Sequence, residues 1–320
     1  MEGMAGLKGK AILVTGGTGF IGGHLVQELL KGKAKVIVID IELNPLSVFI
    51  LDKLGKKVKL ELVDIRDRKK VFKVFSKYSP DFVFHLAAQT TVPRAHRSPY
   101  ETLETNIMGT INVLEASRLS STVKGIIIAS SDKAYGKTNR PYTEDFPLRG
   151  DHPYNVSKSS ADLISQAYYK TYNTPVVITR FGNVYGEGDF HFDRIVPGIC
   201  EAIIKKKTLV IRSNGKYVRD YIYVKDVADG YIFLLKKISS ICGEAYNFSS
   251  NDTLSVIELV NKVETILNVK IPYKILNTAQ NEIPYQHLDD TKIKKLGWIP
   301  QSSLDNSLSD VFLWYSRILK

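Results

Sequence analysis

The sequence contains only two cysteines among its 320 residues, Cys200 and Cys242, and no Cys-x-x-Cys pair. This scarcity argues against a disulfide-stabilised fold and against a zinc or other metal site, and it favours the reducing cytoplasm. No apolar run approaches the length of about 20 residues that spans a bilayer. Residues 1–10 also lack the apolar centre of a signal peptide. We therefore predict a cytoplasmic protein with no metal and no membrane partner.

Acidic residues are in deficit, because 33 Asp and Glu face 44 Lys and Arg, which gives a formal net charge of +11. A basic surface can attract nucleic acid or another anionic ligand, whereas scattered lysines can also simply solvate helix faces. The lysines are spread along the chain, and no zinc-finger, RNA-recognition or helix-turn-helix pattern is present. We therefore expect no nucleic-acid partner.

What the first half does contain is a regular alternation of short β-branched runs and longer amphipathic segments. This pattern is typical of a parallel sheet with helices on both faces. The predicted strands span residues 11–15, 35–40, 58–63, 82–85, 126–130 and 176–180. The predicted helices span residues 20–31, 46–54, 67–78, 100–119 and 154–172. With right-handed crossovers, these elements form a doubly wound, Rossmann-like α/β fold.

After residue 180 the alternation loosens, and helices mix with short strands. We predict a Rossmann domain over residues 1–180, to which residues 218–248 return. Residues 181–320 then form a smaller mixed α/β lobe that holds the substrate.

A glycine-rich segment, TGGTGFIG, joins the first strand to the first helix and contains Gly16, Gly19 and Gly22. Glycines here permit a tight turn and the close approach of a pyrophosphate, which then lies at the helix N-terminus. Asp40 ends the second strand, where a carboxylate binds a ribose 2′-OH and repels a 2′-phosphate. The pattern predicts NAD rather than NADP. The alternative is a strand–turn–helix that binds no ligand.

Tyr154 and Lys158 lie four positions apart in a predicted helix and therefore share one face. An ammonium near a phenol stabilises the phenolate, so we expect a lowered Tyr154 pKa. A phenolate can take a proton from an alcohol while hydride leaves for NAD, and Lys158 can hold the nicotinamide ribose. The spacing is common by chance, so the prediction depends on its combination with the glycine loop and Asp40.

Several segments make the chain similar to the extended short-chain dehydrogenases/reductases, the NAD-dependent nucleotide-sugar epimerases and dehydratases. They are TGGTGFIG, VDIRD, HLAAQ, the TN and GT of residues 105–110, SSDKAYG, YNVSK, RFGNVYG, VRDYIYVKDVA and LGWIP. The resemblance covers nearly the whole chain. It implies NAD in the first domain, a nucleoside-diphosphate sugar in the cleft, and a homodimer through a bundle of helices 100–119 and 154–172.

The resemblance also implies which residues contact NAD. They are Gly16, Gly19, Phe20, Ile21, Gly22, Asp40, Asp64, Ile65, Leu86, Ala87, Ala88, Tyr154 and Lys158. For Asp64, at the end of the third strand, a simple helix N-cap is the alternative.

The segment SSDKAYG places Ser131, Asp132 and Lys133 at the end of a buried strand, where ligands of parallel sheets bind. The Asp-Lys pair resembles that of CDP-glucose 4,6-dehydratases. The resemblance implies that Ser131 binds the sugar 4-OH, Asp132 protonates the leaving 6-OH and Lys133 takes the C5 proton. The alternative is an ordinary ion pair that caps a loop. Because neighbours on a strand point to opposite faces, both side chains reach the sugar only if the chain bends.

The resemblance assigns Asn183, Arg194, Arg212 and Arg219 to the nucleotide sugar, with Arg219 at the diphosphate. For Arg219 the alternative is a structural ion pair with Asp220 or Asp226; for Arg212 a structural role is equally open.

One departure concerns residues 278–290, where many family members carry a further diphosphate arginine and this chain has none. His287 is the candidate substitute, although a single histidine is more often structural.

We predict an NAD-dependent 4,6-dehydratase that oxidises C4, removes water across C5–C6 and returns hydride to C6 of a nucleotide hexose or heptose. A 4-epimerase or 4-dehydrogenase and a non-catalytic NAD-binding protein remain alternatives. The sequence leaves the base and the sugar open.

Overall fold

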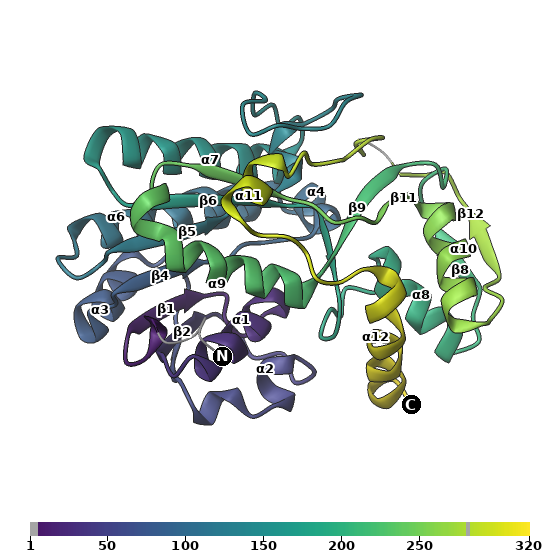
Figure 1. The fold of residues 1–320 in the computed structure, drawn as a ribbon, viewed down its shortest axis with the longest axis horizontal. Helices are drawn as coiled ribbons and strands as arrows, with labels where there is room; N and C mark the ends of the chain where they lie inside the picture. Colours follow the sequence, from purple (N-terminus) through teal and green to yellow (C-terminus); the bar gives the residue numbers. More distant parts are fainter. Residues whose placement is uncertain (1–5, 280–281) are drawn as a thin grey trace.

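The computed structural model of the chain describes residues 6–279 and 282–320. Residues 1–5 and positions 280–281, which belong to the segment 278–290 discussed above, lie outside the described residues. The main element is a seven-stranded parallel sheet in the order β10-β6-β5-β4-β1-β2-β3 (Figure 1). Its strands are β1 (Ala11–Thr15), β2 (Lys35–Asp40), β3 (Lys59–Leu62), β4 (Phe82–His85), β5 (Gly125–Ala129), β6 (Val176–Phe181) and β10 (Ala245–Phe248). The strand order reverses between β1 and β4, which creates the crevice where such sheets bind ligands.

Helices cover both faces of this sheet. They are α1 (Phe20–Lys31) and α9 (Val224–Ile241) on one face, and α3 (Arg68–Tyr78), α6 (Gly109–Leu119) and α7 (Pro153–Tyr172) on the other (Figure 1). Alternate residues along each strand point to opposite faces of the sheet and pack into the hydrophobic cores on those two faces. Ile12 and Val14 pack with α1 and α9, whereas Leu13 packs with α3 and α6. The predicted doubly wound Rossmann-like fold is confirmed.

A smaller lobe with a core of its own lies beside the sheet, at the right of Figure 1. Its three-stranded sheet consists of β11 (Thr253–Ser255), β9 (Val218–Tyr223) and β7 (Asn183–Tyr185), and its two-stranded sheet of β12 (Tyr273–Ile275) and β8 (Leu209–Ile211). Its helices are α8 (Ile195–Ile204), α10 (Val256–Leu267) and α12 (Leu304–Ile318).

The predicted helix 100–119 is wrong as one continuous α-helix. It consists of α5 (Pro99–Leu103), a π-helical turn (Glu104–Met108) and α6, while α2 (Val48–Leu51) and α4 (Val92–Arg97) are short. The π turn holds Asn106, which donates to the carbonyl of Gln89 (3.0 Å) and to the hydroxyl of Ser157 (2.9 Å). Such turns often occur at functional sites, and this one ties the loop after β4 to α7.

The segments assigned to the two domains interleave. Helix α9 and strand β10 pack with the seven-stranded sheet, whereas β9 pairs with β7 and β11. Helix α11 (Thr291–Leu296), from the C-terminal part, packs against β10. The division into domains at residue 180 stays a prediction. Within the part of the chain that the structure describes, no helix combines the length and the apolar character that crossing a membrane requires.

Candidate active site

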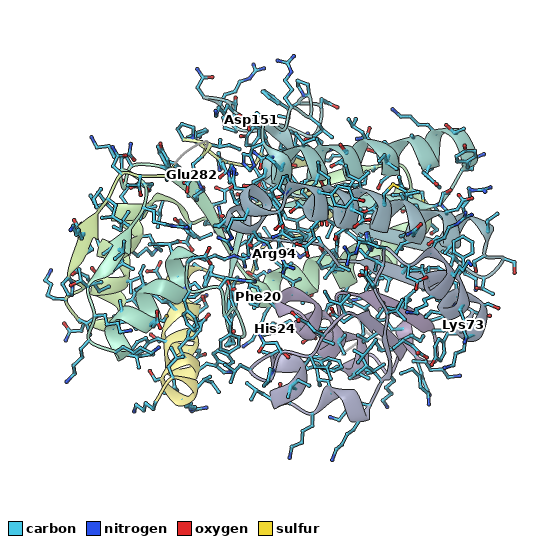
Figure 2. All side chains as sticks on the ribbon, turned by 180° about the vertical axis from the view of Figure 1, so that it is seen from behind. Phe20, His24, Lys73, Arg94, Asp151 and Glu282 are labelled. Carbon is cyan, nitrogen blue, oxygen red and sulfur yellow. The ribbon has the colours of Figure 1, made fainter. Side chains whose placement is uncertain are left out.

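A cleft of about 900 Å³ lies where the carboxyl ends of β1, β4 and β5 meet the smaller lobe. Figure 2 places Phe20 and Arg94, which line it, near the middle of the molecule, and Glu282 on the side of the smaller lobe. The lining includes every residue predicted to contact NAD or the nucleotide sugar, and all catalytic candidates except Asp132. The cleft therefore brings together residues from positions 16 to 286.

The glycine loop is shaped by two close backbone approaches. Gly16 has a φ of +73°, and a Cβ there would lie 2.7 Å from the backbone nitrogen of Ala87. A Cβ at Gly22 would lie 2.0 Å from the carbonyl oxygen of Gly16. Helix α1 begins after Gly19 without a side-chain cap, so its first N–H groups can bind an anion. The loop fits the pyrophosphate of NAD.

Asp40, at the end of β2, faces the same loop. Its Oδ2 accepts hydrogen bonds from the hydroxyl (2.6 Å) and backbone N–H (3.0 Å) of Thr18. Burial raises the pKa of Asp40, while the hydrogen bonds from Thr18 oppose that shift. The Thr18 contact fixes the carboxylate beside the loop, where it suits a ribose hydroxyl.

We expect Asp40→Ala to raise the Kd for NAD about 10- to 100-fold, because a charge-assisted hydrogen bond contributes about 1.5–3 kcal/mol. Discrimination against NADP should weaken at the same time. Calorimetric titration of NAD-stripped protein measures both values, and Glu42→Ala, the removal of another acid from the cleft lining, is the matched control. Unchanged NAD affinity in Asp40→Ala would assign the carboxylate to the Thr18 contact alone.

Asp64 is held by Arg66, whose guanidinium approaches it at 2.6 Å and also reaches Glu104 at 3.0 Å. The N-cap alternative for Asp64 is wrong, because Asp67 caps α3 by accepting from the backbone N–H of Lys70. Asp64 is therefore an oriented carboxylate at the edge of the cleft.

Tyr154 and Lys158 both lie buried on α7. The Nζ of Lys158 donates to the carbonyl of Ala129 at the end of β5, at 2.9 Å. Burial lowers the pKa of Lys158 to about 8. The sheet thus fixes the lysine at the carboxyl edge, one helical turn from the tyrosine.

The expectation of a lowered Tyr154 pKa is wrong for this structure. Burial raises the pKa of Tyr154 to about 12, and the nearby charge of Asp132 adds to the shift. Arg194 and a hydrogen bond with Ser131 favour the phenolate, but by less. Desolvation outweighs the effect of the Arg194 charge, so the phenol is protonated at neutral pH.

Residues Asp132–Tyr135 form a 3₁₀ turn directly after β5. The chain therefore has the bend that Asp132 and Lys133 need if both side chains are to reach the sugar. Asp132, 1% exposed, accepts hydrogen bonds from Ser131 Oγ (2.8 Å) and Lys133 Nζ (3.3 Å) on Oδ1. Its Oδ2 accepts from Gln286 Nε2 at 2.8 Å. The ion pair considered as an alternative is present, and it adjoins Tyr154. Asp132 is not itself among the residues that line the cleft, but its contacts Ser131, Lys133 and Gln286 are.

The substrate candidates line the far part of the cleft. Asn183 accepts from Lys133 Nζ at 3.4 Å, and its buried Nδ2 has no hydrogen-bond partner among residues 6–279 and 282–320. Arg194 donates to Asp189 at 3.0 Å, and Arg212 to the carbonyl of Asp193 at 3.0 Å. The unpaired amide of Asn183 fits a ligand acceptor.

Arg219 pairs with neither acid that we considered. It donates to Glu282 at 3.4 Å and to the carbonyl of Val218 at 2.8 Å. Asp220 instead accepts from His287 at 2.8 Å, and this contact raises the pKa of His287. His287 is not among the residues that line the cleft, so its contact with Asp220 favours the structural alternative, and a role at the phosphate stays a prediction.

Four residues of the site escaped prediction from the sequence: Thr18, Arg66, Glu282 and Gln286. Thr18 and Arg66 lie inside motifs that were recognised, so those motifs carried a usable signal. Glu282 and Gln286 are distant along the chain from their partners, and no local pattern marks them.

A model of the family described as GDP-mannose 4,6 dehydratase matches residues 13–311. The dTDP-glucose 4,6-dehydratase of Neisseria meningitidis is 30% identical, over 96% of this chain and 93% of its own. The CDP-glucose 4,6-dehydratase of Salmonella typhimurium is 30% identical, over 98% and 92%.

Solved structures of 4,6-dehydratases and of 4-epimerases resemble the chain. The dTDP-glucose 4,6-dehydratase DesIV of Streptomyces venezuelae, with NAD bound, has a TM-score of 0.87 and 28% identity, and the match covers 96% of this chain and 97% of that chain. The UDP-glucuronic acid 4-epimerase of Bacillus cereus, with UDP-glucuronic acid and NAD, has a TM-score of 0.89 and 26% identity, over 96% and 99%. The chain therefore belongs to the family described as GDP-mannose 4,6 dehydratase, among the NAD-dependent extended short-chain dehydrogenases/reductases that act on nucleotide sugars.

Proposed function

We propose that the enzyme is an NAD-dependent 4,6-dehydratase of a nucleoside-diphosphate hexose or heptose. The observation that carries this proposal is the cluster of Ser131, the buried Asp132 and Lys133 beside Tyr154, because removal of water needs an acid and a second base that epimerisation does not. The relatives named dTDP- and CDP-glucose 4,6-dehydratase support it.

The glycine loop, Asp40 and Lys158 would hold NAD. Bound there, NAD would accept a hydride from C4 and return it to C6. Tyr154 acts as the base for the 4-OH, and it must first lose its own proton. Ser131 adjoins Tyr154 and donates to Asp132 at 2.8 Å, so a proton that Tyr154 takes up can pass through Ser131 to Asp132. After the phenolate has taken the 4-OH proton, one relay of protons along this path leaves a phenolate at Tyr154 and a carboxylic acid at Asp132.

The same relay prepares the water loss. A ketone at C4 acidifies the C5 proton, and protonated Asp132 no longer stabilises the ammonium of Lys133 by charge. Lys133, whose side chain is partly exposed, first gives its ammonium proton to solvent and then, as the amine, takes the C5 proton. Asp132 gives its proton to the 6-oxygen, which leaves as water. When C6 receives the hydride, Lys133 returns its proton to C5. The proton taken from the 4-OH balances the one that leaves with the water.

The test is a set of separate incubations with CDP-glucose, dTDP-glucose, UDP-glucose, UDP-N-acetylglucosamine and GDP-mannose, followed by mass spectrometry. Loss of one water from any of them supports the dehydratase and identifies a usable nucleotide. Loss of two hydrogens with reduced cofactor would indicate a dehydrogenase. An unchanged mass with a new chromatographic isomer would indicate an epimerase, the second activity among the structural neighbours.

We also infer a homodimer through α6 and α7, because apolar side chains are exposed on and next to these helices: Met108, Leu163 and Tyr172 are 48–55% exposed. Leu163→Glu should convert a dimer to a monomer in light scattering, since a charge would be buried at the interface. Leu313→Glu, at an exposed site on α12, is the matched control. A wild-type protein that is already monomeric would refute the dimer.

The cytoplasmic location stays a proposal as well. It is supported by the two cysteines, which are both free thiols.

A further inference from the structure

We infer that Gln286 is a positioning residue for dehydration, which holds Asp132 in each of its two protonation states. This inference rests on the proposed function, because it concerns the proposed acid of that reaction. It assigns a role to a residue that lies 154 positions from its partner.

The contact is short and enclosed. Gln286 is 2% exposed and donates from Nε2 to Asp132 Oδ2 at 2.8 Å. The other carboxylate oxygen, Oδ1, accepts hydrogen bonds from Ser131 and Lys133. Among the hydrogen bonds of the described residues, Gln286 is the one donor to Oδ2. It therefore fixes the rotation of the Asp132 carboxylate about the Cβ–Cγ bond.

The backbone of Gln286 is anchored on both sides. Its N–H donates to the carbonyl of Val218 at 3.1 Å, and the N–H of Val218 donates to the carbonyl of Pro284 at 3.0 Å. The N–H of Tyr142 donates to the carbonyl of His287 at 2.8 Å. Strand β9 also carries Arg219, the predicted diphosphate ligand. Gln286 therefore links the substrate side of the cleft to the catalytic turn after β5.

The side-chain type matters because Asp132 changes charge in the proposed cycle. A primary amide carries both donors and an acceptor. Nε2 holds the carboxylate, and after rotation of the amide Oε1 can accept from the protonated acid. A leucine could do neither, and a glutamate would favour the protonated form of Asp132 by like-charge repulsion.

The experiment compares Gln286→Leu and Gln286→Glu with wild type on a nucleotide sugar that wild type dehydrates. We expect Gln286→Leu to slow water loss about 100-fold, the cost of a misplaced catalytic group, with little change in KM. C4 oxidation should persist, so reduced nicotinamide should accumulate at its absorbance band. Gln286→Glu should move the pH optimum of water loss upward by about one unit.

Gln301→Leu, which removes an exposed amide elsewhere, is the control. If wild type dehydrates and both Gln286 variants keep its rate and pH profile, the inference is wrong. If Gln286→Leu does not fold, an unshifted pH profile of Gln286→Glu still refutes it. If wild type removes water from no nucleotide sugar, the proposed function itself fails, which is a different result.

Discussion

Tyr154→Phe should lower turnover about 100- to 10,000-fold, the range that a positioned general base contributes. The variant loses one oxygen on a side chain that lines the cleft and contacts Ser131, so binding of NAD and sugar should change little. The effect should appear in kcat with little change in KM. Stopped-flow absorbance of reduced nicotinamide on mixing with the sugar measures the C4 oxidation step directly.

The role of Tyr154 as base also predicts how the rate of C4 oxidation changes with pH. Because burial raises the pKa of Tyr154 to about 12, the phenolate fraction grows with pH across the neutral range. The rate of C4 oxidation in wild type should therefore rise with pH, and this rise should vanish in Tyr154→Phe. Tyr273→Phe, at an exposed site on β12, controls for the loss of a phenol. Oxidation at the wild-type rate in Tyr154→Phe would assign the base to another group.

Asp132→Asn should spare C4 oxidation and slow water loss about 100- to 10,000-fold. Asparagine has nearly the same shape and can still accept from Ser131 and Lys133, but its amide cannot give a proton to the 6-oxygen. Reduced nicotinamide should then accumulate, because hydride cannot return to C6 before water leaves. Absorbance and product mass, followed in parallel, separate the two steps.

The control for this variant is Asp151→Asn, which removes a carboxylate that pairs with Lys137 at the upper edge of the molecule in Figure 2. If Asp132→Asn dehydrates at the wild-type rate, Asp132 is not the acid. Its contacts with Ser131, Lys133 and Gln286 would then be those of a structural ion pair.

Local patterns predicted much of the fold and of the cleft. Strands 11–15, 35–40 and 82–85 coincide with β1, β2 and β4 because buried parallel strands read as continuous apolar runs. The residues predicted for NAD line one cleft because they follow the carboxyl ends of strands of the seven-stranded sheet or lie near the start of the helices after them.

The remaining features depend on tertiary contacts. The prediction of a lowered Tyr154 pKa was wrong because the four-residue spacing to Lys158 indicates that the two residues are close, but not that Tyr154 is buried. Glu282 and Gln286 reach Arg219 and Asp132 through the packing of the C-terminal segment on β9, which has no sequence period. The π turn at Asn106 gains its contacts with Gln89 and Ser157 from distant segments.

The measurement that tests the central claim most directly follows a deuterium atom placed at C4 of the accepted nucleotide hexose. The account predicts a product lighter by one water that keeps the deuterium, and NMR should locate the label at C6. An isomer of unchanged mass with the label still at C4 would show epimerisation without dehydration. Loss of the label into reduced nicotinamide would show a dehydrogenase, and either result would contradict the proposed 4,6-dehydratase.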